Sequence, residues 1–280
     1  MEHNVSTVDD GTSDDTPIWR YIDVPKFVSI LDRRALWFTK AALLLDDPYE
    51  GFCKTKRYEA PSPDDWPKVV LHSGPRGEGP VSLRQMRSNL SHLAADYCES
   101  ARDRLYVNSW CLAGESMAMW QIYGSAGGGV ALRSSVGSYR RAVRIAVREE
   151  QFAFGRVKYH GDIASSSDIH LDFSQGSIPM PGPGLWERIL ELGFHKRACF
   201  EYEKEWRCAL YQDDQGSEVP GCSIDFDLDE LVDEVFVGPR SEPFFLEAVS
   251  SLMQKFGLAR PLKRSELLIG PDRGLAVDAK

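Results

Sequence analysis

The chain has 280 residues, of which 42% are hydrophobic and 27% charged, and its formal net charge is −9. This composition can bury a substantial core, and because no obvious linker divides the sequence, we expect a single domain. The negative balance argues against broad attachment to nucleic-acid backbones or anionic membranes, since both depend on summed positive potential. A local basic patch is still compatible with it. Five arginines lie close together and predict either a nucleic-acid contact or, more commonly, a solvated face: Arg133, Arg140, Arg141, Arg144 and Arg148.

The six cysteines are scattered and form no C-x-x-C pair, so the sequence predicts neither a zinc site nor a disulfide framework. Reduced thiols in a cytoplasm fit this pattern best. No apolar stretch is long enough to cross a bilayer, and the first residues lack the basic and apolar regions of a signal peptide. We therefore expect a soluble cytoplasmic protein without a membrane partner.

Residues 1–16 contain few apolar side chains, and we expect a disordered tail there, followed by one domain over 17–270 and a short tail over 271–280. Hydrophobic periodicity then predicts the elements in chain order. Strands are expected at 19–22, 36–39, 104–112, 129–132, 143–147, 152–159, 203–211, 223–226 and 234–237, with a last one near Leu267. Helices are expected at 26–34, 83–102, 115–123, 185–200 and 243–256, and a proline- and glycine-rich loop at 61–80. Because strands come in runs and do not alternate regularly with helices, the pattern favours an α+β fold.

Several common catalytic motifs are absent. The glycine run at 127–129 lacks the lysine and hydroxyl of a P-loop, and no G-x-G-x-x-G follows a predicted strand. The six histidines show no H-E-x-x-H spacing, and there is no G-x-S-x-G elbow. The sequence therefore argues against P-loop, Rossmann, zinc-peptidase and serine-hydrolase chemistry, and we expect no metal site.

One predicted helix carries aromatic and polar groups on a single face. Ser116, Met119, Trp120 and Tyr123 are spaced at i, i+3, i+4 and i+7. The simpler interpretation is core packing with Ser116 as the N-cap. The alternative is an aromatic wall against which a planar ring could stack.

Two further segments concentrate charge. In the strand predicted at 203–211, Glu203, Glu205 and Arg207 share one face while Trp206 points to the other, which we expect to be the buried one. The charged face is either solvated or lines a cleft, where Arg207 would keep one carboxylate ionised and two neighbouring carboxylates would divide the acid and hydrogen-bonding roles. The turn Asp46-Asp47-Pro48-Tyr49-Glu50 is either turn chemistry alone or part of the same cleft.

Taken in order, these segments resemble the bacterial domain-of-unknown-function family 2971 over residues 17–260. The segments that carry the resemblance are Trp19-Arg20-Tyr21, Leu36-Trp37-Phe38-Thr39, Asp47-Pro48-Tyr49-Glu50, Ser116-x-x-Met119-Trp120-x-x-Tyr123, Gly129-Val130 and Glu203-x-Glu205-Trp206-Arg207. Asp46 departs from the pattern, which usually has asparagine there. The layout, with an early arginine, central aromatics and a late Glu-x-Glu strand, is also similar to that of NAD-dependent ADP-ribosyltransferases.

The second resemblance implies two small, mostly antiparallel sheets with flanking helices that form a cleft for NAD. It implies transfer of ADP-ribose to a protein or nucleic acid by a bacterial toxin or phage-defence effector. Glu205 would be the catalytic carboxylate with Glu203 beside it, and Arg20 would hold the pyrophosphate. Other residues expected around the ligand are Tyr21, Trp37, Thr39, Asp47, Glu50, Ser116, Met119, Trp120, Tyr123 and Arg207. The alternative is a non-catalytic domain in which the same cleft binds a nucleotide or peptide as a sensor.

Overall fold

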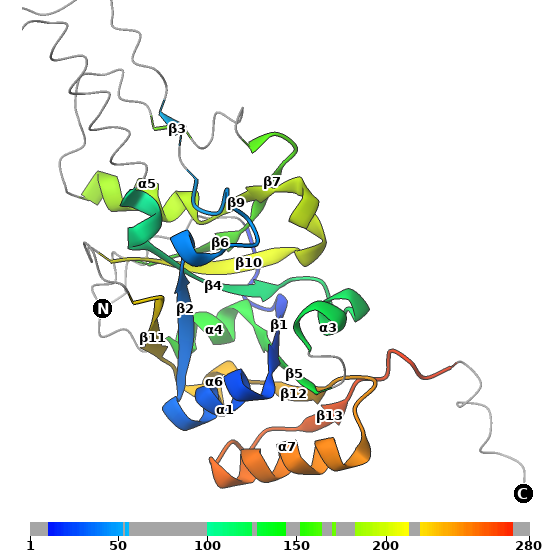
Figure 1. Ribbon diagram of the computed structural model, residues 1–280. Coiled ribbons are helices and arrows are strands. Elements are labelled where there is room, and N and C mark those ends of the chain that lie inside the picture. The colour runs from blue at the N-terminus through cyan, green and yellow to red at the C-terminus, as the bar shows by residue number, and fades with distance from the viewer. Residues whose placement is uncertain are drawn as a thin grey trace, which may run out of the picture.

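The computed structural model describes residues 11–52, 54–55, 100–124, 128–143, 152–163, 170–171, 183–212 and 219–270 (Figure 1). The strands are β1 (Pro17–Asp23), β2 (Ala35–Lys40), β3 (Lys54–Thr55), β4 (Leu105–Cys111), β5 (Gly129–Ser135), β6 (Phe152–Arg156), β7 (Lys158–His160), β8 (His170–Leu171), β9 (His195–Arg197), β10 (Glu205–Tyr211), β11 (Gly221–Asp225), β12 (Glu234–Val237) and β13 (Leu262–Arg264). The α-helices are α1 (Val24–Arg33), α3 (Met117–Tyr123), α4 (Val136–Ala142), α5 (Pro183–Leu192), α6 (Leu228–Leu231) and α7 (Pro243–Lys255), and η1 (Ala41–Leu43) and η6 (Ala198–Glu203) are 3₁₀ helices.

Nine of these strands form one sheet, and the sheet forks at β4. Along one edge β4 pairs with β10 over its whole length, and β6 lies beyond β10. Along the other edge, β2 pairs with β4 only at Tyr106 and Val107, whereas β1 pairs with it only at Cys111. The β2–β11 arm and the β1–β5–β12–β13 arm therefore leave β4 at different points, with a gap between them.

The sheet arrangement corrects the expectation of two small sheets. Because β4 is paired along both edges, the strands belong to one large, mostly antiparallel sheet, with β12 and β13 as a parallel pair. Two separate two-stranded parallel sheets, β3–β8 and β7–β9, accompany it among the described residues. The α+β class and the cleft-forming arrangement remain.

Local sequence explains how α1 follows β1 so tightly. The Asp23 carboxylate accepts a hydrogen bond from the Lys26 backbone N–H at 2.8 Å, and Pro25 occupies the first turn, where its missing N–H costs nothing. The helix ends at Arg34, whose φ of 51° is left-handed. Its apolar side chains, Phe27, Ile30 and Leu31, are buried, so the opposite face is left for solvent and the cleft.

A buried asparagine ties the two sides of the fork together. Asn108 Oδ1 accepts hydrogen bonds from Trp110 Nε1 at 2.8 Å and from the Tyr139 hydroxyl at 3.1 Å, while its Nδ2 donates to the Trp37 carbonyl at 2.9 Å. Tyr139, on α4, is itself surrounded by aromatic rings of the main core. Side-chain bonds from Asn108 therefore replace strand pairing where β2 departs from β4.

We predict that Asn108→Ala lowers the free energy of unfolding by at least about 2 kcal/mol, because two buried donors lose their acceptor. Urea unfolding followed by tryptophan fluorescence measures this, with Ser223→Ala on the exposed surface of β11 as the control. A loss no larger than that of the control would contradict this account of the fork.

Several predicted boundaries were wrong for identifiable reasons. The helix expected at 185–200 ends at Leu192, because Gly193 follows and the chain turns into β9 and η6. The strand expected at 203–211 begins only at Glu205, since Lys204 has a φ of 44°. The strand expected at 152–159 divides at Val157 into β6 and β7. The last strand is β13 and lies before Leu267, which is 41% exposed.

Other predictions fall partly or wholly outside the described residues. These include the loop at 61–80, most of the helix at 83–102, all of the strand at 143–147 except Val143, residues 1–10 and residues 271–280. Val143 forms an isolated bridge with Phe226. Within the predicted N-terminal tail, the Thr12 hydroxyl accepts a hydrogen bond from Arg156 at 2.8 Å and Asp14 pairs with Arg140 at 2.8 Å, so residues 12–14 contact the domain.

Candidate functional site

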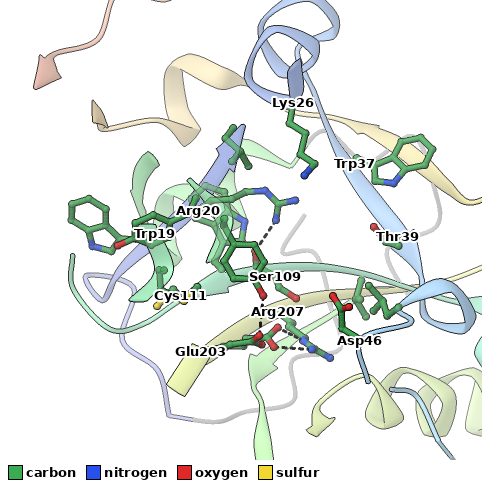
Figure 2. A pocket seen from close by; sticks show the side chains of 18 of the residues that line it. Trp19, Arg20, Lys26, Trp37, Thr39, Asp46, Ser109, Cys111, Glu203 and Arg207 are labelled. Atoms are coloured by element: carbon green, nitrogen blue, oxygen red, sulfur yellow. Dashed lines mark hydrogen bonds and ion pairs between the residues drawn. The ribbon is translucent and has the colours of Figure 1, made fainter. Parts of the chain in front are cut away.

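A cavity of about 470 Å³ lies in the fork of the sheet, which is within the range typical of small-molecule sites. Its walls come from β1, α1 and β2, and its floor comes from β4, η6 and β10. Figure 2 shows cationic side chains on one side of this space and carboxylates with Arg207 on the other. The gap between the two arms thus has the position and the volume of a ligand site.

Three carboxylates and two cations, all almost fully buried, form one cluster at the cavity floor. Arg207 binds Glu205 with two nitrogens, Nε at 2.6 Å and Nη2 at 3.0 Å, and its Nη1 contacts Glu50. Lys196 Nζ lies 2.5 Å from Glu203, 2.7 Å from Glu205 and 3.8 Å from Glu50. The sequence did not decide whether this charged face was solvated, and the structure shows that it is buried and lines the cavity.

The strand alternation of β10 explains part of this cluster. Glu205 and Arg207 share a face and bind each other, while Trp206 points into the core on the opposite face. Glu203 is different: it is the last residue of η6, not part of the strand, and it reaches the cluster because Lys204 reverses the backbone. The predicted proximity of the two glutamates is right, but the predicted geometry was wrong.

The two glutamates ionise differently. Burial, together with the neighbouring Glu205 carboxylate, raises the pKa of Glu203 to about 7. Burial acts in the same direction on Glu205, but Arg207 and Lys196 outweigh it and hold the Glu205 pKa well below its usual value. Above the Glu203 pKa of about 7, the three carboxylates outnumber the two cations by one, so this end of the cavity then has net negative charge and suits a cationic group.

Two tyrosine hydroxyls complete the surroundings of the glutamates. Tyr123, at the end of α3, donates to Glu203 Oε1 at 2.9 Å, and the Tyr159 hydroxyl accepts from the Glu205 backbone N–H at 2.8 Å. Burial followed by the charge of Glu203 raises the pKa of Tyr123, so its hydroxyl stays protonated as a donor. Tyr123 is 39% exposed and lines the cavity, so its ring is accessible to a ligand.

The opposite end of the cavity is cationic. Arg20 donates to the Ser109 carbonyl at 2.6 Å, at the point where β4 has no strand partner on that edge. Lys26 and Arg33 extend from α1 and also line the cavity, and Figure 2 shows the Lys26 ammonium directed toward the Arg20 guanidinium. The cavity therefore has a cationic end and an acidic end.

Most of the residues expected around a ligand meet at this cavity. Those that line it are Arg20, Tyr21, Trp37, Thr39, Asp47, Glu50, Met119, Tyr123, Glu203, Glu205 and Arg207. Asp46 lines the cavity as well. Asp47 is buried, and its carboxylate binds Arg197 at 2.8 Å. Ser116 and Trp120 do not line it.

Ser116 and Trp120 have structural roles. Ser116 caps α3, and its backbone N–H donates to the Tyr21 hydroxyl at 2.9 Å. Trp120 is 4% exposed, donates to Glu115 and packs edge-on against Tyr21. The simpler interpretation of the helix face, core packing, therefore holds for Trp120, while Met119 and Tyr123 reach the cavity.

Lys196 and Lys26 are site residues that the sequence reasoning missed. Lys196 fell inside the helix expected at 185–200, where no alternation could be recognised. Lys26 was assigned to a helix, but its proximity to Arg20 depends on how α1 turns back from β1. The signal in the sequence for this turn was Asp23, which caps the N-terminus of α1 directly after β1.

No group of histidine, cysteine, aspartate or glutamate side chains suited to a metal ion occurs among the described residues. The described cysteines, Cys111, Cys199, Cys208 and Cys222, are all free. In the part of the chain that the structure describes, no helix has the length and apolar character needed to cross a membrane.

Together, the fold and the site define a mixed α+β protein with a two-ended polar cavity in a forked sheet. No family model matches the chain, so the resemblance to the domain-of-unknown-function family 2971 gains no support from this comparison, and no curated protein matches either. The solved structures that are distantly similar over nearly its full length include three complexes of one protein. Thermus sp. 2.9 DarT in complex with NAD+ is 12% identical with a TM-score of 0.37, and 91% of this chain and 98% of that one are covered.

The complex of the same protein with carba-NAD+ is 14% identical with a TM-score of 0.36 (90% and 96% covered). Its complex with ADP-ribosylated ssDNA is 13% identical with a TM-score of 0.37 (90% and 94% covered). These values describe a distant structural resemblance and are too low to transfer a function.

Proposed function

We propose that the cavity binds NAD+ and that the protein transfers ADP-ribose from it to a macromolecular acceptor, a protein or a nucleic acid. The observation that carries this proposal is the division of the cavity into a cationic end and an acidic end. NAD+ has the complementary division, with a pyrophosphate at its centre and a positively charged nicotinamide ring at one end. The Thermus complexes contain NAD+ and an ADP-ribosylated DNA, but the proposal depends on the cavity and not on that distant resemblance.

The cationic end would bind the pyrophosphate. A guanidinium suits two phosphate oxygens at once, and Arg20 is already fixed in orientation by the Ser109 carbonyl. Lys26, whose ammonium lies 3.0 Å from the Asp23 carboxylate, would supply a second positive charge from α1. Tyr123 is 39% exposed and offers a ring surface at the cavity wall, against which a base would pack, and Trp37 and Tyr21 also line the cavity.

The acidic end would promote cleavage of the bond to nicotinamide. The bond between ribose C1′ and the ring nitrogen breaks, and its electron pair leaves with nicotinamide, so positive charge develops on the ribose. A fixed carboxylate at Glu205 stabilises that charge more in the transition state than in the ground state. The acceptor then forms a bond to C1′ and gives up its proton, for which Glu203, with a pKa of about 7, is a suitable base.

A transferase of this kind would act in a bacterial cytoplasm as a toxin or phage-defence effector, the roles that the resemblance to ADP-ribosyltransferases implies. Its acceptor would supply the nucleophile. In the absence of an acceptor, water would take that place and the products would be nicotinamide and free ADP-ribose.

The test measures NAD+ binding by calorimetry and nicotinamide release by chromatography, with and without cell extract. We expect Arg20→Gln to weaken NAD+ binding by about 10- to 100-fold, the value of one charge-assisted hydrogen bond. Arg141→Gln is the matched control, because Arg141 is an exposed arginine paired with Glu230 outside the cavity. If NAD+ neither binds nor is cleaved under any of these conditions, the transferase proposal fails and the binding-domain alternative takes its place.

A further inference from the structure

Lys196 occupies the centre of the carboxylate cluster. It lies on β9, outside the forked sheet, and its side chain is 9% exposed. Its ammonium is within 2.7 Å of both Glu203 and Glu205 and is 3.8 Å from Glu50. One cation therefore contacts carboxylates from three segments: η6, β10 and the turn that contains Glu50.

The residues that follow Lys196 hold its ammonium at the centre of the carboxylate cluster. After β9, η6 turns back so that Phe200 lies beneath the ammonium at 4.7 Å from ring centroid to Nζ, and Glu203 closes the loop onto it. The next residue, Arg197, binds Asp47 at 2.8 Å. Lys196 and Arg197, which are consecutive on β9, thus hold the acidic turn of residues 46–50 through Glu50 and Asp47.

Arg207 does not duplicate this arrangement. It binds Glu205 and Glu50, whereas the cation that binds Glu203 is Lys196, beside the neutral Tyr123 hydroxyl. Without Lys196, two carboxylates would share a buried volume with no cation between them, and one of them would take up a proton or move away.

We propose that Lys196 is a positioning residue that keeps Glu203 and Glu205 together as an ionised pair at the acidic end of the cavity. This inference rests on the proposed function, in which Glu205 stabilises the charge on the ribose and Glu203 accepts the proton of the acceptor. The other titratable groups that interact with Glu203 are Glu205 on β10, Tyr123 on α3, Tyr159 on β7, Tyr202 on η6 and Cys111 on β4, and those that interact with Lys196 include Arg207 and Glu50.

The experiment compares Lys196→Met, which keeps the length of the side chain without its charge, with Lys196→Arg and with Lys158→Met. Lys158 is an exposed lysine on the adjoining strand β7 and serves as the matched control. Nicotinamide release is measured from pH 5 to pH 9. We expect Lys196→Met to lose at least about tenfold in rate at pH 7 and to recover partly at higher pH, with the acidic limb moved upward by about one pH unit or more. Lys196→Arg should restore part of the loss, and Lys158→Met should follow the wild type.

Urea unfolding at pH 5 and pH 8 gives a second reading that does not depend on activity. The pKa of Glu203 is higher in the folded state than in the unfolded chain, so stability is lost as pH rises from the unfolded value through the folded one. Removing the Lys196 charge raises the folded pKa further. The unfolding constant of Lys196→Met relative to wild type should therefore be about tenfold larger at pH 8 than at pH 5.

The two readings separate this inference from the proposed function. If no NAD+ is cleaved by the wild type, the proposed function fails, yet the pH-dependent unfolding still shows whether Lys196 holds the ionised pair. If Lys196→Met is destabilised equally at pH 5 and pH 8, Lys196 contributes only packing and the inference is overturned. An unchanged pH profile in an active Lys196→Met protein would overturn it as well.

Discussion

Replacing Trp206 with alanine is expected to lower the free energy of unfolding by about 3–5 kcal/mol, because a cavity replaces a fully buried indole. Trp206 is 0% exposed on the inner face of β10. Its ring stacks on Phe154 at 5.9 Å between centroids and meets Tyr139 edge-on at 5.1 Å. Both neighbours are themselves fully enclosed, so the structure cannot collapse into the space.

Chemical denaturation measures this loss, with Trp37→Ala as a control because that tryptophan is 39% exposed on β2. The control should lose less than Trp206→Ala, because part of the Trp37 ring is already in contact with water and its removal leaves no enclosed cavity. Equal losses in the two variants would show that Trp206 does not hold β10 in the core.

Replacing Glu205 with glutamine is expected to reduce nicotinamide release by about a hundredfold or more while NAD+ affinity changes little. The substitution keeps the shape of the side chain but removes the charge that stabilises the developing positive charge on the ribose. Single-turnover release of nicotinamide, together with calorimetric binding of NAD+, separates the two effects.

The structure adds a stability cost to this variant, because both Glu205 oxygens bind buried cations. Breaking such a network costs about 3–5 kcal/mol, so folding must be checked by circular dichroism at the assay temperature. Glu230→Gln is the control, since it removes a surface carboxylate paired with Arg141. Full turnover in a folded Glu205→Gln protein would exclude Glu205 as the catalytic group, and Glu203 would be tested next.

Much of the local structure could be predicted from sequence because it depends on neighbouring residues. The alternation of Glu205, Trp206 and Arg207 correctly predicts which side chains share a face, since strand periodicity needs no distant partner. The start of α1 follows from Asp23 and Pro25 in the same way. Local patterns also indicated the segments around Tyr123, Glu205 and Glu50, whereas Arg20 and Trp37 were expected at the cavity only because of the family resemblance.

The remainder depends on contacts between distant segments. That the strands form one sheet depends on β4 pairing along both edges, which no single segment encodes. Lys196 was missed because its role appears only when β9, η6 and β10 are brought together. Trp120 shows the opposite case: its helix position was compatible with both the core and the cavity, and in the structure it packs against Tyr21 in the core.

At the fork of the sheet, Arg20 has both a structural role and a place in the cavity wall. Arg20 bonds the Ser109 carbonyl where strand pairing stops, and the same side chain forms part of the cavity wall. Asn108 likewise joins β4 to β2 through the carbonyl of Trp37, which is one of the residues that line the cavity. The width of the cavity is therefore set by side chains and not by the backbone ladder. Mutations that change the shape of this cavity will therefore also change the contacts that hold β1 and β2 to β4. The ligand specificity of the cavity and the stability of the sheet cannot change independently.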